Sequence, residues 1–112
     1  MNLALLELEP EFLRRVDDTH FQRVETMADA DGVIFVCPKC FVANGKRRPG
    51  VHSVICWQPR VPQSTKPGPG RWRFEGTGLD NLTLVARSSS ILLTPPGCGW
   101  HGYIRNGRVT NA

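Results

Sequence analysis

The sequence contains no apolar run of about 18 residues, the length that a membrane-spanning helix needs. Its first residues, MNLALLELEPEF, place no basic residue before the apolar stretch, and acidic residues follow at once, which argues against a secretory signal peptide. There is no internal repeat, and the only compositionally biased segment is the proline- and glycine-rich stretch 58–70. We therefore expect a cytoplasmic globular protein without a membrane partner, whose four cysteines are thiols or metal ligands rather than disulfides.

Acidic residues become rare after Asp31. Residues 1–31 contain eight acidic and three basic residues, whereas residues 32–112 contain two acidic and eleven basic residues. The basic excess predicts either a surface that binds phosphates or acidic proteins, or one that balances the acidic segment within the fold. Because 112 residues match the usual size of one domain, we expect a single zinc-binding domain over 1–112. It combines an acidic helical segment (1–31) with a basic β-rich part (32–112).

The spacing of apolar residues near the N-terminus predicts a helix. The residues concerned recur at near-helical intervals: Leu5, Leu8, Phe12, Leu13 and Val16. Pro10 is well placed to begin a helix, so we expect one over 9–17. A second helical turn is expected over 24–30, ending at Gly32.

The rest of the chain predicts short strands, at 33–36, 51–57, 71–76, 82–86, 88–94 and 101–110. In the second of these, His52 shares a face with Cys56 because side chains alternate along a strand. The Asn106-Gly107 pair predicts a tight hairpin. The expected fold class is therefore α+β: a small, mainly antiparallel β-sheet with an N-terminal helix, stapled by a zinc-ribbon-like site.

Two motifs share the spacing of zinc ligands. CPKC offers Cys37 and Cys40, and CGWH offers Cys98 and His101, each pair separated by two residues. Tight turns with this spacing aim two side chains at one ion, and Zn²⁺ prefers four sulfur and nitrogen ligands in a tetrahedron. We expect Zn²⁺ at Cys37, Cys40, Cys98 and His101. Because four protein ligands close the coordination sphere, the site is expected to be structural and the protein is not expected to be an enzyme.

Other interpretations of these residues are weaker. A redox CxxC motif normally opens a helix, and none is expected after CPKC. A nucleophilic Cys98–His101 pair would need an orienting group that the sequence does not supply. A zinc deaminase would need a glutamate two residues after the histidine, which His52 lacks. His52 is instead the reserve nitrogen ligand, Cys56 is expected in the core, and His20 on the surface.

Basic residues near the metal motif are candidate contacts for a partner. Lys46, Arg47 and Arg48 form a turn, here called the basic turn, between two pairs of turn-forming residues. Basic groups interleaved with aromatics bind single-stranded nucleic acid, and Trp72 lies between two arginines. Strand alternation, however, places Trp72 on the opposite face from those arginines, so we expect it in the core.

From Asp31 to Val109 the order of motifs resembles a family of small uncharacterised, zinc-ribbon-like proteins of bacteriophages and prophages. The matching pieces are ADGVIFVCPKCF, GVHSV, PGPGRWRFEGTGLDNLTL, SSSILL and GCGWHGYIRNG. The resemblance implies the same four ligands and a location in the bacterial host cytoplasm or the virion. It brings no established activity.

The expected function is that of a phage-type protein with structural zinc that acts as a protein-interaction module. Its partner would be a phage or host protein, and the module would be a virion component or a modulator of a host protein. The alternative is a nucleic-acid-binding zinc-ribbon protein. No small-molecule substrate is evident from the sequence.

Overall fold

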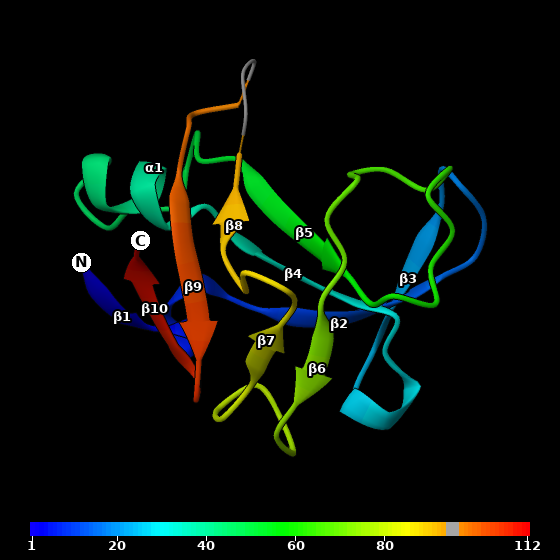
Figure 1. Ribbon diagram of the computed structural model, residues 1–112. Coiled ribbons are helices and arrows are strands. Elements are labelled where there is room, and N and C mark those ends of the chain that lie inside the picture. Colours follow the sequence, from blue (N-terminus) through cyan, green and yellow to red (C-terminus); the bar gives the residue numbers. More distant parts are fainter. Residues whose placement is uncertain (94–96) are drawn as a thin grey trace.

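The computed structural model describes residues 1–93 and 97–112, which form three antiparallel β-sheets (Figure 1). One sheet has the strand order β1-β10-β9-β8, a second has β3-β2-β4-β5, and the third is the hairpin β6-β7. The elements are β1 (Asn2–Ala4), β2 (Glu11–Arg15), β3 (Phe21–Val24), β4 (Gly32–Val36), α1 (Pro38–Ala43), β5 (Ser53–Trp57), β6 (Arg73–Glu75), β7 (Thr83–Val85), β8 (Ile91–Leu92), β9 (His101–Arg105) and β10 (Arg108–Asn111). In the described part of the chain, no helix has the length and apolar character needed to cross a bilayer.

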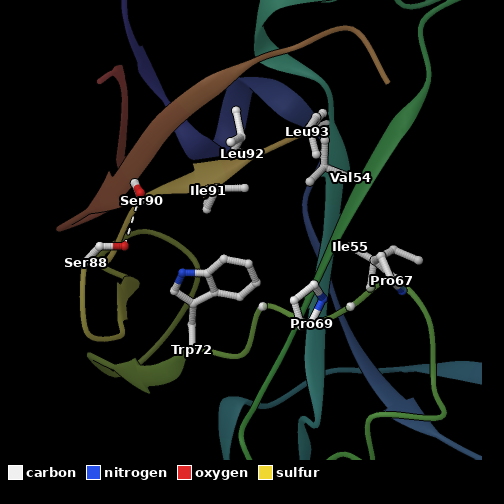
Figure 2. A pocket seen from close by; sticks show the side chains of 12 residues that line it. Val54, Ile55, Pro67, Pro69, Trp72, Ser88, Ser90, Ile91, Leu92 and Leu93 are labelled. Carbon is white, nitrogen blue, oxygen red and sulfur yellow. Dashed lines mark hydrogen bonds between the residues drawn. The ribbon is translucent and has the colours of Figure 1, made fainter. Parts of the chain in front are cut away.

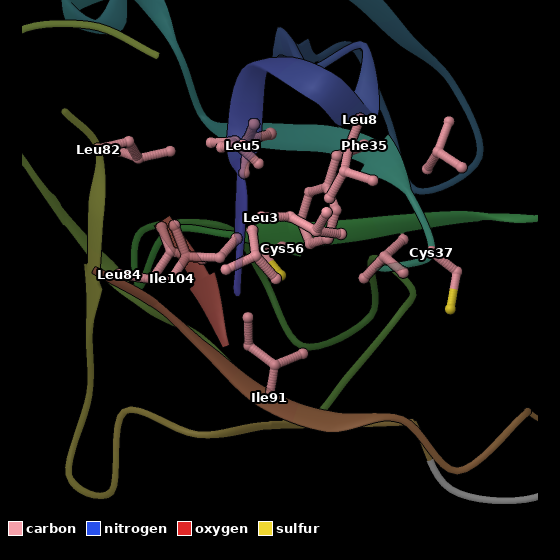
Figure 3. Close-up of a cluster of buried hydrophobic side chains, with 14 of the residues drawn as sticks. Leu3, Leu5, Leu8, Phe35, Cys37, Cys56, Leu82, Leu84, Ile91 and Ile104 are labelled. Atoms are coloured by element: carbon pink, nitrogen blue, oxygen red, sulfur yellow. The ribbon is translucent and has the colours of Figure 1, made fainter. Parts of the chain in front are cut away.

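The main hydrophobic core receives side chains from all three sheets (Figure 3). Phe35 of β4 meets Trp100, just before β9, edge to face with ring centroids 6.3 Å apart. Phe12 of β2 lies against Phe74 of β6 with centroids 6.5 Å apart. These aromatic pairs join the sheets across the core, where burial of apolar area supplies most of the driving force for folding.

A second, smaller apolar cluster lies on the other face of β2 and β5. It consists of Leu13, Trp57 and Val61, with Ile34 and Ile55 packed beside them. Since neighbouring residues of a strand point to opposite faces, β2, β4 and β5 contribute to both clusters. Both faces of this sheet are therefore covered at its centre.

The expected N-terminal helix is wrong, and with it the α+β fold class: the structure is mainly antiparallel β. Residues 11–15 form strand β2, in which Phe12 enters the main core and Leu13 the second cluster. Glu9 interrupts the chain with a left-handed backbone (φ 50°) after a 3-10 turn over Leu5–Leu8. The near-helical spacing thus arises from a turn followed by a strand buried on both faces. The second expected helical turn is a single 3-10 turn, Met27–Asp29.

A strand is found in each range expected from residue 33 onward, although the bounds differ: β4 begins one residue earlier, and 101–110 contains the two strands β9 and β10. The expected strand 88–94 is reduced to β8, and its last residue, Thr94, lies outside the described residues. Asn106 and Gly107 both have positive φ angles, 48° and 71°, and connect β9 to β10 as the expected hairpin. This geometry suits a two-residue turn that follows the twist of its strands.

The proline-rich stretch 58–70 is folded around one side chain. The Arg71 guanidinium donates hydrogen bonds of 2.7–3.1 Å to five backbone carbonyls, those of Val61, Pro62, Thr65, Pro67 and Gly70. The Trp57 indole adds a bond to the Lys66 carbonyl. A planar guanidinium with five N–H donors satisfies carbonyls that a segment without regular structure would leave unpaired.

Ion pairs connect the acidic N-terminal segment to the basic part of the chain. Arg60 pairs with Asp31 at 2.8 Å, and Arg48 pairs with Glu9 at 2.6 Å. β2 and β3, from the acidic segment, also belong to the same sheet as β4 and β5. Part of the basic excess is therefore balanced within the fold.

We predict that Gly107→Ala destabilises the protein far more than Gly50→Ala. Both glycines have left-handed backbones, φ 71° and 83°, so alanine costs each about 1–2 kcal/mol. A Cβ at Gly107 would also overlap the backbone of Asp80, whereas one at Gly50 would meet no atom within 4 Å. Urea unfolding of both variants measures the difference, and equal losses would contradict the close contact between this hairpin and Asp80.

Candidate metal centre

Cys37 and Cys40 lie at the junction of β4 and α1. β4 ends at Val36, Cys37 is the N-cap of α1, and Pro38 occupies the first helical turn. The Cys37 carbonyl accepts the first helical bond, from the Phe41 N–H at 2.9 Å. The expectation that no helix follows CPKC is therefore wrong. Proline suits this position because its ring presets the helical φ angle and no N–H is needed there.

His52 is brought beside Cys37 by the pairing of β4 with β5. The register places Val36 opposite Ser53. One residue further, the Cys37 N–H donates a 2.9 Å hydrogen bond to the His52 carbonyl. His52 also shares its strand face with Val54 and Cys56, which point into the main core. The His52 side chain is itself exposed, and it reaches the site of the cysteines from the surface end of this row.

Cys98 completes the group from the segment that precedes β9. Its Sγ lies 3.5 Å from the Cys37 Sγ, far beyond the disulfide bond length of about 2.05 Å. The ligand atoms of Cys37, Cys40, His52 and Cys98 all lie within 4.8 Å of one another. Around tetrahedral zinc, with Zn–S bonds of about 2.3 Å, sulfurs are about 3.8 Å apart. The four side chains are close enough to hold one metal ion.

His101 is placed outside this group. Trp100 is buried in the core, and the next residue, His101, begins β9 with an exposed side chain. In an extended chain, neighbouring side chains point in opposite directions, so burial of Trp100 turns His101 toward solvent. The structure thus brings together three of the four expected ligands and adds the reserve histidine, His52, in place of His101.

The three thiols of the cluster differ in acidity. Burial raises the pKa of Cys37 to about 12, and burial is also the main reason why the pKa of Cys40 is raised. Burial acts in the same direction on Cys98, but hydrogen bonds from the Trp100 N–H, His52 and the other two thiols lower its pKa to about 7. Cys98 is therefore the first thiol to ionise. A bound cation would favour the thiolate form at all three positions, so metal binding releases protons.

The other sequence candidates lie apart from the cluster. Cys56 is fully buried, as expected, and burial raises its pKa. His20 is exposed on the β2–β3 turn, where its Nδ1 lies 2.9 Å from Asp17. Trp72 is half-buried against the main core. All three side chains of the basic turn are exposed, and Arg48 forms a surface ion pair with Glu9.

The helix after CPKC does not by itself make the pair a redox motif. A redox CxxC depends on a lowered thiol pKa at its first cysteine, whereas here the pKa of Cys37 is raised. A third thiol and an imidazole also lie within reach of the pair, which is the ligand set of a metal site. Comparisons of the chain with protein-family models, with curated proteins and with solved structures found no match.

We predict that His52→Ala weakens metal binding at least about tenfold. Loss of a group that supports a metal site typically reduces the metal affinity by this factor or more. His101→Ala should leave the affinity unchanged, because its imidazole lies outside the cluster of ligand atoms. Titration of the reduced protein with Co²⁺, followed by its thiolate charge-transfer absorption, measures both variants. The opposite ranking would return the nitrogen ligand to His101.

Proposed function

We propose that the protein is a small β-rich binding module whose fold is stapled by one structural Zn²⁺ ion, held by Cys37, Cys40, His52 and Cys98. The observation that carries this proposal is the meeting of three thiols and one imidazole from three separate segments. Zn²⁺ is the metal that suits this mixed sulfur and nitrogen set best, since it prefers four-coordinate tetrahedral sites of this composition.

A structural role fits both the ligand number and the position of the site. Four protein ligands leave no coordination position for a substrate or a water molecule. The ion would tie the start of β5, at the edge of one sheet, to the segment entering β9 of another sheet. The other contacts that join the segment entering β9 to β4 and α1 include a 2.8 Å hydrogen bond from the Lys39 Nζ to the Cys98 carbonyl and the packing of Phe35 on Trp100.

Binding to another protein is the activity we assign to the module. A closed zinc site supplies no catalytic water, which favours binding over metal-assisted catalysis. The resemblance of Asp31–Val109 to phage proteins implies a phage or host protein as the partner. It likewise implies a location in the bacterial cytoplasm or in the virion, and these finer points stay predictions.

We predict one zinc ion per chain and a large loss of stability when a ligand is removed. Cys98→Ser should abolish stoichiometric zinc binding and lower the melting temperature by more than about 10 °C. The reason is that the free energy of binding a structural zinc ion adds to the free energy of folding. Metal analysis with X-ray absorption would give three sulfurs and one nitrogen around the ion. Thermal unfolding with and without a chelator measures the contribution to stability.

Cys56→Ala is the matched control for this variant. It removes a cysteine that is buried in the core and lies outside the cluster. It should lose some stability through the small cavity that it creates, but it should keep one zinc ion per chain. A Cys37–Cys40 disulfide in freshly reduced protein, or a Cys98→Ser variant as stable as the parent, would contradict a structural zinc site.

Nucleic acid is the second candidate partner, and the basic turn is the observation that favours it. Lys46, Arg47 and Arg48 are exposed directly after α1, whose first turn carries Cys40. Arg48 pairs with Glu9, so a phosphate contact by Arg48 would have to replace this ion pair. The same turn would suit an acidic patch on a protein partner, so its contribution is testable for both candidates.

We predict that replacing Lys46, Arg47 and Arg48 together with Ser changes partner binding but not folding. Their side chains are exposed, and the Arg48–Glu9 pair is a surface pair, so the free energy of unfolding should change by no more than about 1 kcal/mol. With a nucleic acid, the slope of log affinity against log salt should fall by about one unit per lost phosphate contact. With an acidic protein, association should slow more than dissociation accelerates.

The control triple variant replaces Arg73, Arg87 and Arg105 with Ser. These arginines are also exposed, so the net charge changes by the same amount at other sites. Equal effects of the two triple variants would mean that only net charge matters. Binding that is unchanged in the first variant would remove the basic turn from the interface.

A further inference from the structure

A cavity of about 370 Å³ lies between β5 and β8, closed on one side by the proline-rich stretch and Trp72 (Figure 2). Its volume falls within the range of about 300–1,000 Å³ that is usual for binding pockets. The walls are mostly apolar and include Ile55, Pro67, Pro69 and Leu93. Among the described residues that line it, none is charged.

Both strands that border the cavity are the last strands of their sheets. β5 ends the sheet β3-β2-β4-β5, and β8 ends the sheet β1-β10-β9-β8. A terminal strand presents backbone N–H and C=O groups along its outer edge. The cavity is therefore flanked by two sheet edges as well as by apolar side chains.

The register shows which residue of β5 turns its backbone toward the cavity side. The Cys37 N–H donates to the His52 carbonyl, and the Gln58 N–H donates to the Asp31 carbonyl. Since hydrogen-bonding direction alternates along an antiparallel strand, Ile55 turns its N–H and C=O away from β4. Trp57, two residues further, follows the same rule, and its carbonyl accepts a 2.9 Å bond from the Trp72 N–H.

The same reasoning applies to β8. The Leu93 N–H donates to the carbonyl of Trp100, the residue just before β9. Leu92, one residue earlier, therefore turns its backbone groups away from β9, to the outer edge. Within residues 1–93 and 97–112, no backbone hydrogen bond reaches the outer edge at Ile55 or at Leu92. Leu92, which lines the cavity, is 55% exposed.

One end of the cavity carries polar groups. The Trp72 Nε1 is buried and has no hydrogen-bond partner among the described residues. Figure 2 shows this nitrogen on the side of the ring toward Ser88 and Ser90, whose hydroxyl oxygens lie 3.2 Å apart. Because the Trp72 Nε1 has no surface open to the cavity, the two hydroxyl groups are the polar groups that a peptide would meet at this end.

We propose that this cavity binds one extended peptide segment of a partner protein, which adds as a strand to the outer edge of β5. This inference rests on the proposed function as a binding module and names the form of its partner. The free edge at Ile55 fixes an extended backbone, and the uncharged apolar walls select apolar side chains at alternate positions. The lack of charged lining groups disfavours a phosphate-bearing ligand. The five bonds from Arg71 hold the proline-rich wall in place before the peptide binds.

The test begins with a random library of linear dodecapeptides, selected on the zinc-loaded full-length protein. The tightest peptide is synthesised and titrated by calorimetry into the parent, Ile55→Pro and Ile55→Val. Proline removes the outward N–H of Ile55 and leaves the β4 ladder intact, as at other edge positions. Valine keeps the N–H. We expect about a tenfold or greater loss of affinity for Ile55→Pro and little change for Ile55→Val.

A second measurement keeps the parent protein and changes the peptide. Two peptides are made, one N-methylated at the odd-numbered amides and the other at the even-numbered amides. Only every second amide of an added strand donates to the edge of β5, so one of the two peptides should lose binding and the other should keep it. Trp72→Phe removes part of the aromatic wall, and the lost apolar contact should weaken binding about threefold to tenfold. These readouts remain decisive if Ile55→Pro fails to fold.

Three outcomes would overturn the proposal. The first is that no peptide binds with a dissociation constant below 1 mM (about −4 kcal/mol). The second is that both methylated peptides bind equally well. The third is that a single-stranded oligonucleotide binds in this cavity and peptides do not. Zinc content and melting temperature are measured on the same preparations. Stoichiometric zinc without peptide binding would reject the peptide site alone, whereas peptide binding without zinc would reject the structural metal.

Discussion

The pairing of β4 with β5 is the constraint on which the rest of the structure depends. Five residue pairs, from Gly32 with Trp57 to Val36 with Ser53, fix one register. A shift by one residue would move Val54 and Cys56 out of the main core and reverse both faces of the strand. The same register brings His52 beside Cys37 and turns the backbone of Ile55 outward. The core, the metal cluster and the free sheet edge therefore follow from one ladder.

The strands and the cysteines could be predicted because their signals are local. A β-branched run leads into CPKC, and the expected burial of Cys56 in the core is confirmed. The N-terminal strand could not be predicted in this way. A strand buried on both faces places apolar residues side by side, as Phe12 and Leu13 are, and a preceding turn adds apolar residues at helical intervals. Periodicity alone does not separate that pattern from a helix.

The nitrogen ligand shows where motif spacing misleads. CGWH has the spacing of CPKC, but Trp100 is needed in the core against Phe35, and burial of that ring turns His101 to solvent. His52 is identified as a ligand by the pairing of two strands and not by a local motif. In an antiparallel pair, the residue before one strand lies opposite the residue after the other. His52 lies opposite Cys37 because Val36 pairs with Ser53, a register that the expected strand ranges 33–36 and 51–57 do not specify. The Arg71 bonds to the proline-rich stretch carried no such signal, because five carbonyls from one loop converge only after folding.

The metal cluster and the cavity are linked through β5. His52 stands immediately before the first residue of this strand, while Cys98 belongs to the segment that connects β8 to β9. An ion held by both would fix the start of β5 relative to the sheet that ends at β8, and these are the two edges that flank the cavity. At the other end of β5, the bond from the Trp72 N–H to the Trp57 carbonyl fixes the proline-rich wall. With both ends of β5 held, the edge at Ile55 keeps its spacing and direction without a partner present. A peptide strand would then bind to an edge that is already ordered, so little of its binding free energy would be spent on ordering the protein.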